Sequence, residues 1–187
     1  DQDEVRVAYQ SVEAKYGAID VLINNVGIVV GKYFHEHTEV DIARTMNINT
    51  TASMNITRLF LQGMMKQDFG YICNIASSAG LISNPRMSVY AASKWAMLGW
   101  SDSLRLEMKQ LKKDIHVTTV TPYYINTGMF DGIRSRVPIL KPEKVAKQII
   151  RGMEKARPIV SMPWSYRFVR FFQGLFAVWL FDWFVGD

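Results

Sequence analysis

The chain has 187 residues, of which 49% are hydrophobic and 21% charged, enough apolar material for one folded domain with a buried core. This composition excludes disordered, collagen-like and low-complexity proteins. One cysteine, Cys73, and three scattered histidines exclude a disulfide scaffold and a metal site. The net charge of +5 comes from basic residues interspersed with acidic ones, so we expect no nucleic-acid partner.

The chain opens on a predicted helix. Acidic residues stand at its start, where they favour the helix dipole, and an apolar pattern from Val5 to Tyr16 runs up to Gly17. An acidic start is not typical of a secretory signal peptide. The first residue is Asp1 rather than methionine, so we expect a fragment or cropped chain.

Strand and helix patterns then alternate. Val21–Ile23 is a continuous apolar run, typical of a central parallel strand covered on both faces. The further predicted elements are a helix over about 39–66, a strand over 71–76, a helix over 90–112, a strand over 116–121, a helix opening at Pro142 and a strand over 159–162. The alternation predicts an α/β domain of the doubly wound class with a parallel sheet, over residues 1–163.

Residues 164–187 differ in composition, because they hold ten of the 23 aromatic residues. The longest uncharged run, 171–181, is too short to span a bilayer as a helix. Two interpretations stay open, and they are compatible. The segment packs on the core or caps a substrate pocket, or it contacts a membrane surface through its aromatic and arginine side chains.

Tyr90 and Lys94 lie four residues apart on a predicted helix, so a phenol and an ammonium share one face. Such a pair alone is weak evidence for a functional site, because it usually belongs to a solvent-exposed helix face. Ser77 stands 13 residues before Tyr90, directly after a predicted strand. Asn24 and Pro122 follow the two neighbouring strands, and ligand sites of α/β proteins collect at this carboxyl edge.

With these residues in place, the chain resembles the short-chain dehydrogenase/reductase (SDR) family over nearly all of residues 1–163. Asn24-Asn25-Val26-Gly27 is similar to the Asn-Asn-Ala-Gly signature of the family, which steadies the central sheet beside the cofactor. The alternative for these residues is an ordinary strand-ending turn. Gly80 and Tyr90, three and 13 residues after Ser77, match the family pattern and favour Ser77 over Ser78.

The resemblance implies a Rossmann-like fold and hydride transfer between a nicotinamide cofactor, NAD or NADP, and a carbonyl or alcohol carbon. Tyr90 is then the acid/base, with its pKa lowered by the Lys94 ammonium and the nicotinamide charge. Ser77 would hold the substrate oxygen, and Lys94 the nicotinamide ribose.

The resemblance also assigns Asn49, which lies 28 residues before Ser77, to a water relay leading from Lys94. Asn47 is the competing candidate. Thr127, five residues after Pro122, matches the threonine that binds the cofactor carboxamide, with Ile125 beside it; the alternative for Thr127 is a helix N-cap. Tyr123 stands where the family usually has glycine. We therefore expect Asn24, Gly27, Pro122, Ile125 and Thr127, with Tyr90 and Lys94, to contact the cofactor.

The glycine-rich phosphate-binding turn of the family has no counterpart in the sequence. We therefore expect that about sixty residues of the first βαβ unit are missing. The residue that distinguishes NAD from NADP would lie in that unit. An inactive truncated chain would not disprove the function that the resemblance implies for the family.

Residues 127–132 and 138–142 resemble the retinol dehydrogenase and 17β-hydroxysteroid dehydrogenase branch. This branch implies a lipophilic alcohol or carbonyl substrate (retinoid, steroid or long-chain), lipid metabolism and peripheral membrane contact. Two alternatives stay open: a broad aldehyde/ketone or acyl-chain reductase, and a non-catalytic membrane-associated binding protein. We expect a homo-oligomer, and an intracellular location, either cytoplasmic or on the cytoplasmic face of the endoplasmic reticulum or a lipid droplet.

Overall fold

The computed structural model describes residues 2–129, 138–169 and 171–172. Its longer helices are α1 (Gln2–Tyr16), α2 (Glu39–Met46), α3 (Ala52–Gln67), α4 (Ser88–Gln110) and α5 (Pro142–Glu154). Its strands are β1 (Val21–Asn24), β2 (Gly70–Ile75), β3 (Ile115–Pro122) and β4 (Ile159–Met162). Short helical turns are η1 (Phe34–Glu36), η2 (Asn47–Thr51), η3 (Ser78–Gly80) and η4 (Trp164–Phe168). Every predicted helix and strand is present, with ends shifted by a few residues.

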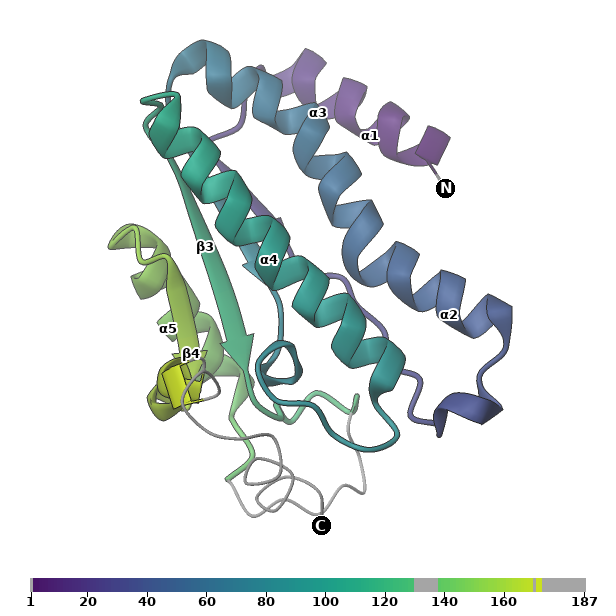
Figure 1. The fold of residues 1–187 in the computed structure, drawn as a ribbon. Coiled ribbons are helices and arrows are strands. Elements are labelled where there is room, and N and C mark those ends of the chain that lie inside the picture. Colours follow the sequence, from purple (N-terminus) through teal and green to yellow (C-terminus); the bar gives the residue numbers. More distant parts are fainter. Residues whose placement is uncertain (1, 130–137, 170, 173–187) are drawn as a thin grey trace.

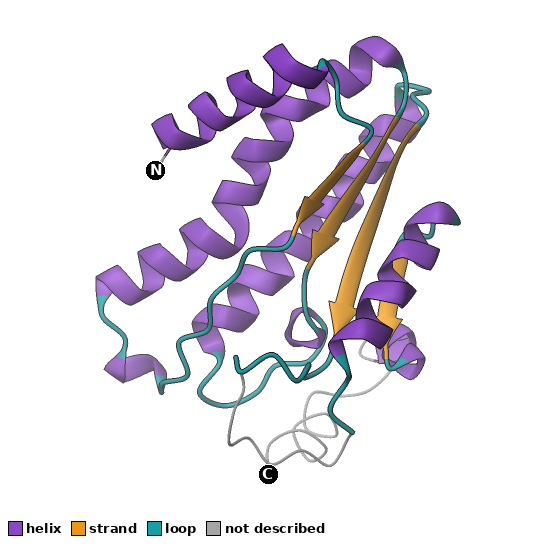
Figure 2. Cartoon of the chain, turned by 180° about the vertical axis from the view of Figure 1, so that it is seen from behind, coloured by secondary structure: helices purple, strands orange, loops and turns teal. Residues whose placement is uncertain are grey.

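The four strands form one parallel sheet in the order β1-β2-β3-β4. Helices α3 and α4 lie on one face, with α1 across α3 (Figure 1). Helix α5 lies on the opposite face, in front of β3 and β4 when the molecule is seen from behind (Figure 2). Helices on both faces of a parallel sheet confirm the doubly wound α/β prediction.

Alternate residues of the strands supply two separate cores. Ile72 of β2 and Val117 of β3 pack with Leu104 and Met108 under α4. Strand residues that point to the opposite face of the sheet, such as Cys73 of β2 and Val120 of β3, pack with residues of α5 and β4. Because side chains alternate along a strand, strands with near-continuous apolar sequence fill both cores.

The expectation that β1 is covered on both faces is wrong for this chain. Leu22 is buried, but Val21 and Ile23 on the opposite face are 48% and 49% exposed. That face carries α5, whose sheet contacts are chiefly with β3 and β4. Among the described residues, an apolar hollow lined by Val21, Ile23 and Tyr71 therefore remains beside α5. The continuous apolar sequence of β1 does not tell its covered face from its open one.

The predicted helix over residues 39–66 has two α-helical parts joined by the π-helical turn η2. Its start is fixed at Thr38, whose side chain accepts a hydrogen bond from Asp41 N while the Asp41 carboxylate accepts one from Thr38 N. The π turn places Asn49 and Thr50 against α4, where both are buried. Such turns occur frequently at functional sites.

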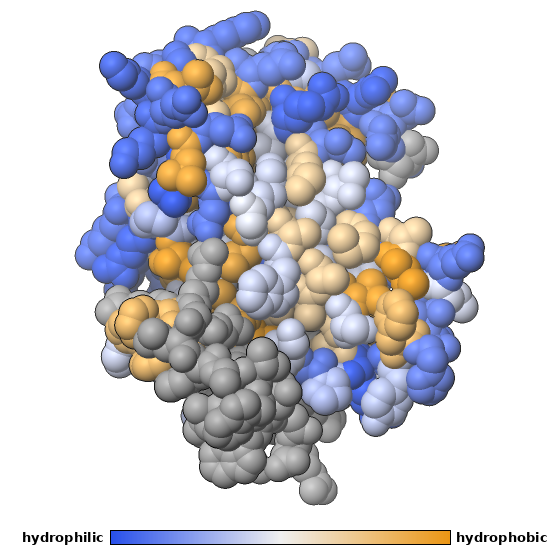
Figure 3. Space-filling view, viewed as in Figure 1, coloured by the Kyte–Doolittle hydropathy of each residue, from blue (hydrophilic) through white to orange (hydrophobic). Residues whose placement is uncertain are grey.

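The predicted aromatic segment 164–187 lies mostly outside the described residues. Its described start, η4, exposes Trp164 and Phe168, whose rings meet edge to face. In the described part of the chain, none of the helices is both long and apolar enough to cross a membrane. The surface view shows mostly hydrophilic side chains at the top, over α1 and the upper ends of α3 and α4 (Figure 3). More apolar side chains lie lower in the same view, in the direction of the carboxyl ends of the strands.

Candidate active site

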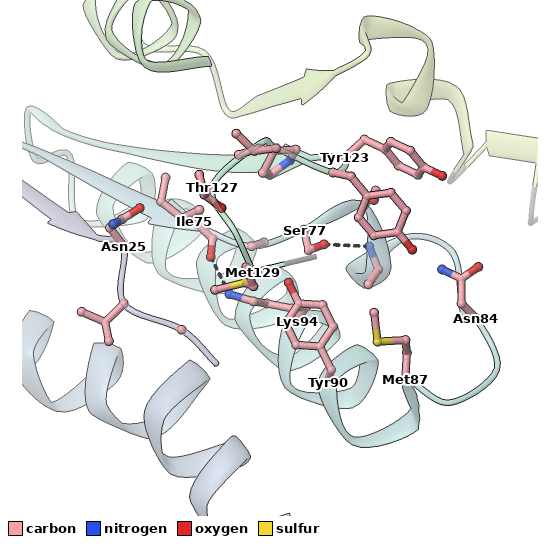
Figure 4. A pocket seen from close by; sticks show the side chains of 18 residues that line it. Asn25, Ile75, Ser77, Asn84, Met87, Tyr90, Lys94, Tyr123, Thr127 and Met129 are labelled. Carbon is pink, nitrogen blue, oxygen red and sulfur yellow. Dashed lines mark hydrogen bonds between the residues drawn. The ribbon is translucent and has the colours of Figure 1, made fainter. Parts of the chain in front are cut away.

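A cavity of about 430 Å³ opens at the carboxyl ends of β1, β2 and β3. It lies within the size range of small-molecule sites. Seven of the predicted site residues line it: Gly27, Ser77, Tyr90, Lys94, Pro122, Ile125 and Thr127. Figure 4 shows the side chains of Ser77, Tyr90 and Lys94 converging in it. Among the described lining residues, only Lys94 is charged.

Ser77 is the residue at which β2 passes into the short turn η3. Its hydroxyl oxygen accepts a hydrogen bond from the backbone N–H of Ala79 at 3.1 Å. The turn packs directly on α4, because a Cβ atom at Gly80 would lie 2.7 Å from the carbonyl oxygen of Lys94. Gly80 thus permits the close approach that sets Ser77 beside Tyr90 and Lys94. Ser78, the competing candidate, also lines the cavity.

Tyr90 and Lys94 lie on the first two turns of α4 and are 5% and 4% exposed. Burial raises the pKa of Tyr90 above its ordinary value. A hydrogen bond with the Ser77 side chain acts in the opposite direction, and the nearby Tyr124 raises the pKa further. In the chain without cofactor the net shift is thus upward, opposite to the expected lowering, because burial is the largest effect. The lowering expected from Lys94 together with a bound nicotinamide stays a prediction.

The Lys94 ammonium donates a hydrogen bond to the carbonyl oxygen of Ile75, with an Nζ–O distance of 2.9 Å. It lies 5.8 Å from the centre of the Tyr90 ring. Burial lowers the pKa of Lys94 from 10.5 to about 8, because the charged form is poorly solvated there. One backbone carbonyl fixes the direction of the ammonium and leaves further N–H donors for a ligand.

Asn49 is fully buried and fastens the loop after β1. Its side-chain oxygen accepts from Ile28 N at 2.8 Å, and its amide donates to Ile28 O at 2.9 Å and to the Ser93 hydroxyl at 3.0 Å. A Cβ atom at Gly27 would lie 3.4 Å from both Asn49 Oδ1 and Lys94 Nζ. Asn49 is therefore beside Lys94, whereas Asn47 is exposed on the outer surface. The relay water assigned to Asn49 stays a prediction.

Asn24 lies outside the set of residues that line the cavity. Its side-chain amide donates to Thr57 Oγ1 at 2.8 Å and to Asn74 Oδ1 at 2.7 Å. The Asn74 amide in turn donates to the Ser101 hydroxyl at 2.8 Å. This buried network joins β1 and β2 to α3 and α4. Asn24 thus steadies the sheet behind the cavity rather than contributing to its wall.

Pro122, Ile125 and Thr127 lie where the chain leaves β3. Ile125 pairs with Leu140 in an isolated parallel bridge, and the backbone of Asn126 donates to Leu140 O at 3.0 Å. Thr127 is exposed at the cavity rim. Gly128 follows with a φ of +86°, in the left-handed region that favours glycine. The alternative role of Thr127 as a helix N-cap concerns residues from 130 on, which are outside the described part.

Sequence reasoning missed several lining residues, among them Asn25, Asn84, Met87, Tyr124 and Met129. Four of these residues lie in loops, and Met87 lies at the end of a loop, directly before α4. Loops carry no periodicity that could assign their side chains to a cavity. It also missed Ser93, whose buried hydroxyl donates to Tyr90 O and accepts from Asn49. A serine three residues after Tyr90 on the same helix face was the available signal.

A family profile described as short chain dehydrogenase matches residues 1–138. Retinol dehydrogenase 10-B from Danio rerio is 36% identical over 169 residues, 87% of this chain and 50% of the relative. Retinol dehydrogenase 10 from Homo sapiens is 34% identical over 181 residues, 93% of this chain and 53% of the relative. The chain therefore spans about half the length of the curated relatives it matches.

A solved structure has the same fold. The crystal structure of a short-chain dehydrogenase from Streptomyces avermitilis is similar with a TM-score of 0.76 and 26% sequence identity. The match covers 86% of this chain and 66% of the other. The parallel sheet and its helices are thus arranged as in a known Rossmann-like protein.

Proposed function

The chain belongs to the short-chain dehydrogenase family of oxidoreductases, and we propose that it carries the part of the site where a carbonyl or alcohol carbon exchanges a hydride with NAD or NADP. One observation supports this most strongly. The hydroxyls of Ser77 and Tyr90 and the ammonium of Lys94 come from two separate elements and meet, buried, in one cavity.

The residues supply a proton path and a holder for the substrate oxygen. Tyr90 gives its phenolic proton to the oxygen formed in reduction, or takes the proton of an alcohol in oxidation. Ser77 is held by Ala79 N and shares a hydrogen bond with Tyr90, so its hydroxyl lies beside the acid/base, where it would hold the substrate oxygen. Lys94 lies next to Tyr90 and favours the phenolate when its ammonium is charged.

The residues fit the nicotinamide half of a dinucleotide. Lys94 would hold the ribose hydroxyls through the ammonium protons not used by Ile75. Ile125 and Thr127 form the opposite wall, where an apolar and a hydroxyl side chain suit a flat ring with an amide. When bound, the nicotinamide supplies or accepts the hydride. Asn49 and Gly27 keep the loop after β1 close to Lys94.

We further propose a lipophilic substrate: a retinoid, a steroid or a long-chain alcohol or ketone. Met87, Met129 and Tyr124 give the cavity walls that are largely apolar. Two relatives are named retinol dehydrogenases. The second candidate is a broad aldehyde/ketone or acyl-chain reductase, favoured by the open rim at Thr127 and Met129.

The exposed aromatic side chains of Trp164, Phe168, Phe171 and Phe172 support peripheral membrane contact as part of the same proposal. Flotation with lipid vesicles tests this contact.

The exposed Trp95 and Leu106 on α4 support pairing of two copies through this helix. Light scattering that finds only monomers at all concentrations would contradict the pairing.

The function is tested with reduced cofactor and a panel of aldehydes and ketones, by following the loss of nicotinamide absorbance. We expect turnover by a protein that contains this chain, strongest with lipophilic substrates, and its loss in Tyr90→Phe, which has no proton to transfer. The control is Tyr71→Phe, which removes a phenolic hydroxyl outside the cavity. Tight cofactor binding with no turnover of any substrate would instead indicate a binding protein without catalysis.

A further inference from the structure

Two adjacent tyrosines, Tyr123 and Tyr124, follow β3, and both line the cavity, but their closest neighbours differ. Tyr123 turns toward η4, where its ring lies 5.7 Å from that of Tyr166 (Figure 4). Tyr124 is part of the cavity wall and interacts electrostatically with the Tyr90 hydroxyl, raising the pKa of Tyr90. The phenol of Tyr124 is therefore close to the group that we propose moves the proton.

The backbone holds Tyr124 on both sides. Its carbonyl oxygen accepts from Leu140 N at 2.9 Å, and the preceding N–H of Tyr123 donates to Met162 O at 2.8 Å. The Tyr123 and Tyr124 rings are in contact, with centres 4.5 Å apart. Two backbone hydrogen bonds thus hold the main chain at Tyr124, and the Tyr123 ring packs against the Tyr124 ring, which lowers the entropy lost on binding.

We propose that Tyr124 is a further substrate-contacting residue, whose hydroxyl donates to the reacting oxygen beside Ser77 and Tyr90 and whose ring lies against the carbon that bears it. The inference rests on the proposed function. Three hydroxyls from three elements, η3, α4 and the loop after β3, then surround one oxygen. The ring of Tyr124, with Met87 and Met129, provides an apolar flank for the adjoining substrate chain.

The test compares Tyr124→Phe with Tyr166→Phe, which removes a hydroxyl from the same aromatic cluster outside the cavity. Reduction of retinaldehyde and of the small aldehyde propanal is measured across pH. We expect kcat of Tyr124→Phe to fall roughly tenfold with both substrates, less than for a dedicated oxyanion-hole donor. The remaining activity keeps the pH dependence set by Tyr90, because the Tyr124 pKa is raised above its ordinary value of 10 and its hydroxyl is uncharged at working pH.

A second variant tests the ring. Tyr124→Ala should raise KM severalfold for retinaldehyde and little for propanal, because only the larger substrate contacts the flank. If Tyr124→Phe retains the kcat of Tyr166→Phe with both substrates, the proposed hydroxyl contact is wrong. If Tyr124→Ala retains the KM values of the unaltered protein, the proposed ring contact is wrong.

Binding without turnover separates this proposal from the proposed function. The fluorescence of retinol is titrated with the unaltered chain, Tyr124→Phe and Tyr124→Ala. If the unaltered chain never turns over an aldehyde, the proposed function fails. The Tyr124 contact is still supported by retinol binding that weakens in both variants. Equal retinol affinity in all three proteins, or no binding by the unaltered chain, overturns it.

Discussion

Lys94 is a buried ammonium whose protonation depends on the fold. Its pKa falls from 10.5 to about 8 in the folded chain, whereas in the unfolded chain it returns to the ordinary value. Between these two values the unfolded chain binds more protons than the folded chain. The free energy of unfolding therefore rises with pH across this window.

We expect the unaltered chain to gain about 2 to 3 kcal/mol of stability relative to Lys94→Met between pH 7 and pH 10. The variant has no titrating group at this position, so subtraction isolates the lysine. Urea unfolding at each pH measures the difference. A difference that stays flat, or that falls with rising pH, would show that Lys94 is solvated in the folded chain.

Residues with a family pattern could be found from sequence, and residues defined by a loop path could not. The spacing of Ser77, Gly80 and Tyr90 identified three neighbours, because strand β2, turn η3 and helix α4 leave little freedom between them. Tyr124 was missed because adjacent residues in a loop have no fixed sidedness. The direction of the Tyr90 pKa shift was also missed, since burial and the carbonyl bound by Lys94 are not visible in the sequence.

At the scale of elements, the contact between η3 and α4 depends on Gly80. An alanine there would place a methyl group 2.7 Å from Lys94 O, a backbone atom that cannot move without distorting α4. We expect Gly80→Ala to destabilise the fold by about 2 kcal/mol or more and to remove activity. The control is Gly99→Ala in α4. A Cβ atom at Gly99 would have no neighbour within 4 Å, so alanine there should stabilise the fold by about 0.5 to 1 kcal/mol. Thermal unfolding measures the stability of both variants. A Gly80→Ala variant as stable as the unaltered chain would refute the close contact between η3 and α4.

Asn49 joins the π turn η2 to the loop after β1 and to α4. Removing its side chain leaves Ile28 N–H, Ile28 C=O and the Ser93 hydroxyl without this partner. We expect Asn49→Ala to cost about 2 to 4 kcal/mol, because polar groups in partly or fully buried surroundings lose hydrogen bonds. Asn47→Ala, at an exposed position two residues away, should change stability by less than about 0.5 kcal/mol. Equal losses in the two variants, measured by urea unfolding, would contradict the assignment.

The elements themselves were largely predictable, since strong apolar runs and Gly or Pro punctuation fix where strands and helices begin. The break in the helix over residues 39–66 was not predicted, because η2 contains no Gly or Pro that would mark it in the sequence. The coverage of β1 was also misjudged. A run such as Val21–Ile23 records only that its side chains are apolar, and not which neighbour covers each face.

For the whole molecule, the two faces of β1 and β2 should differ in their contribution to stability. Ile72 is fully buried beneath α3 and α4, while Ile23 is half exposed beside α5. We expect Ile72→Ala to cost about 2 to 5 kcal/mol and Ile23→Ala about 1 kcal/mol or less. Urea unfolding measures both. If the two variants lose the same stability, the face that carries Ile23 is not open in solution.

We propose that this chain holds the nicotinamide end of a hydride-transfer site, and titration with nicotinamide ligands is the first test of that proposal. Reduced nicotinamide mononucleotide and NADH are added while energy transfer from Trp95 and Trp100 on α4 is recorded. We expect saturable energy transfer with both ligands, with an affinity that Lys94→Met weakens at least tenfold and Gly99→Ala leaves unchanged. No saturable binding, or equal affinity in Lys94→Met, would contradict it.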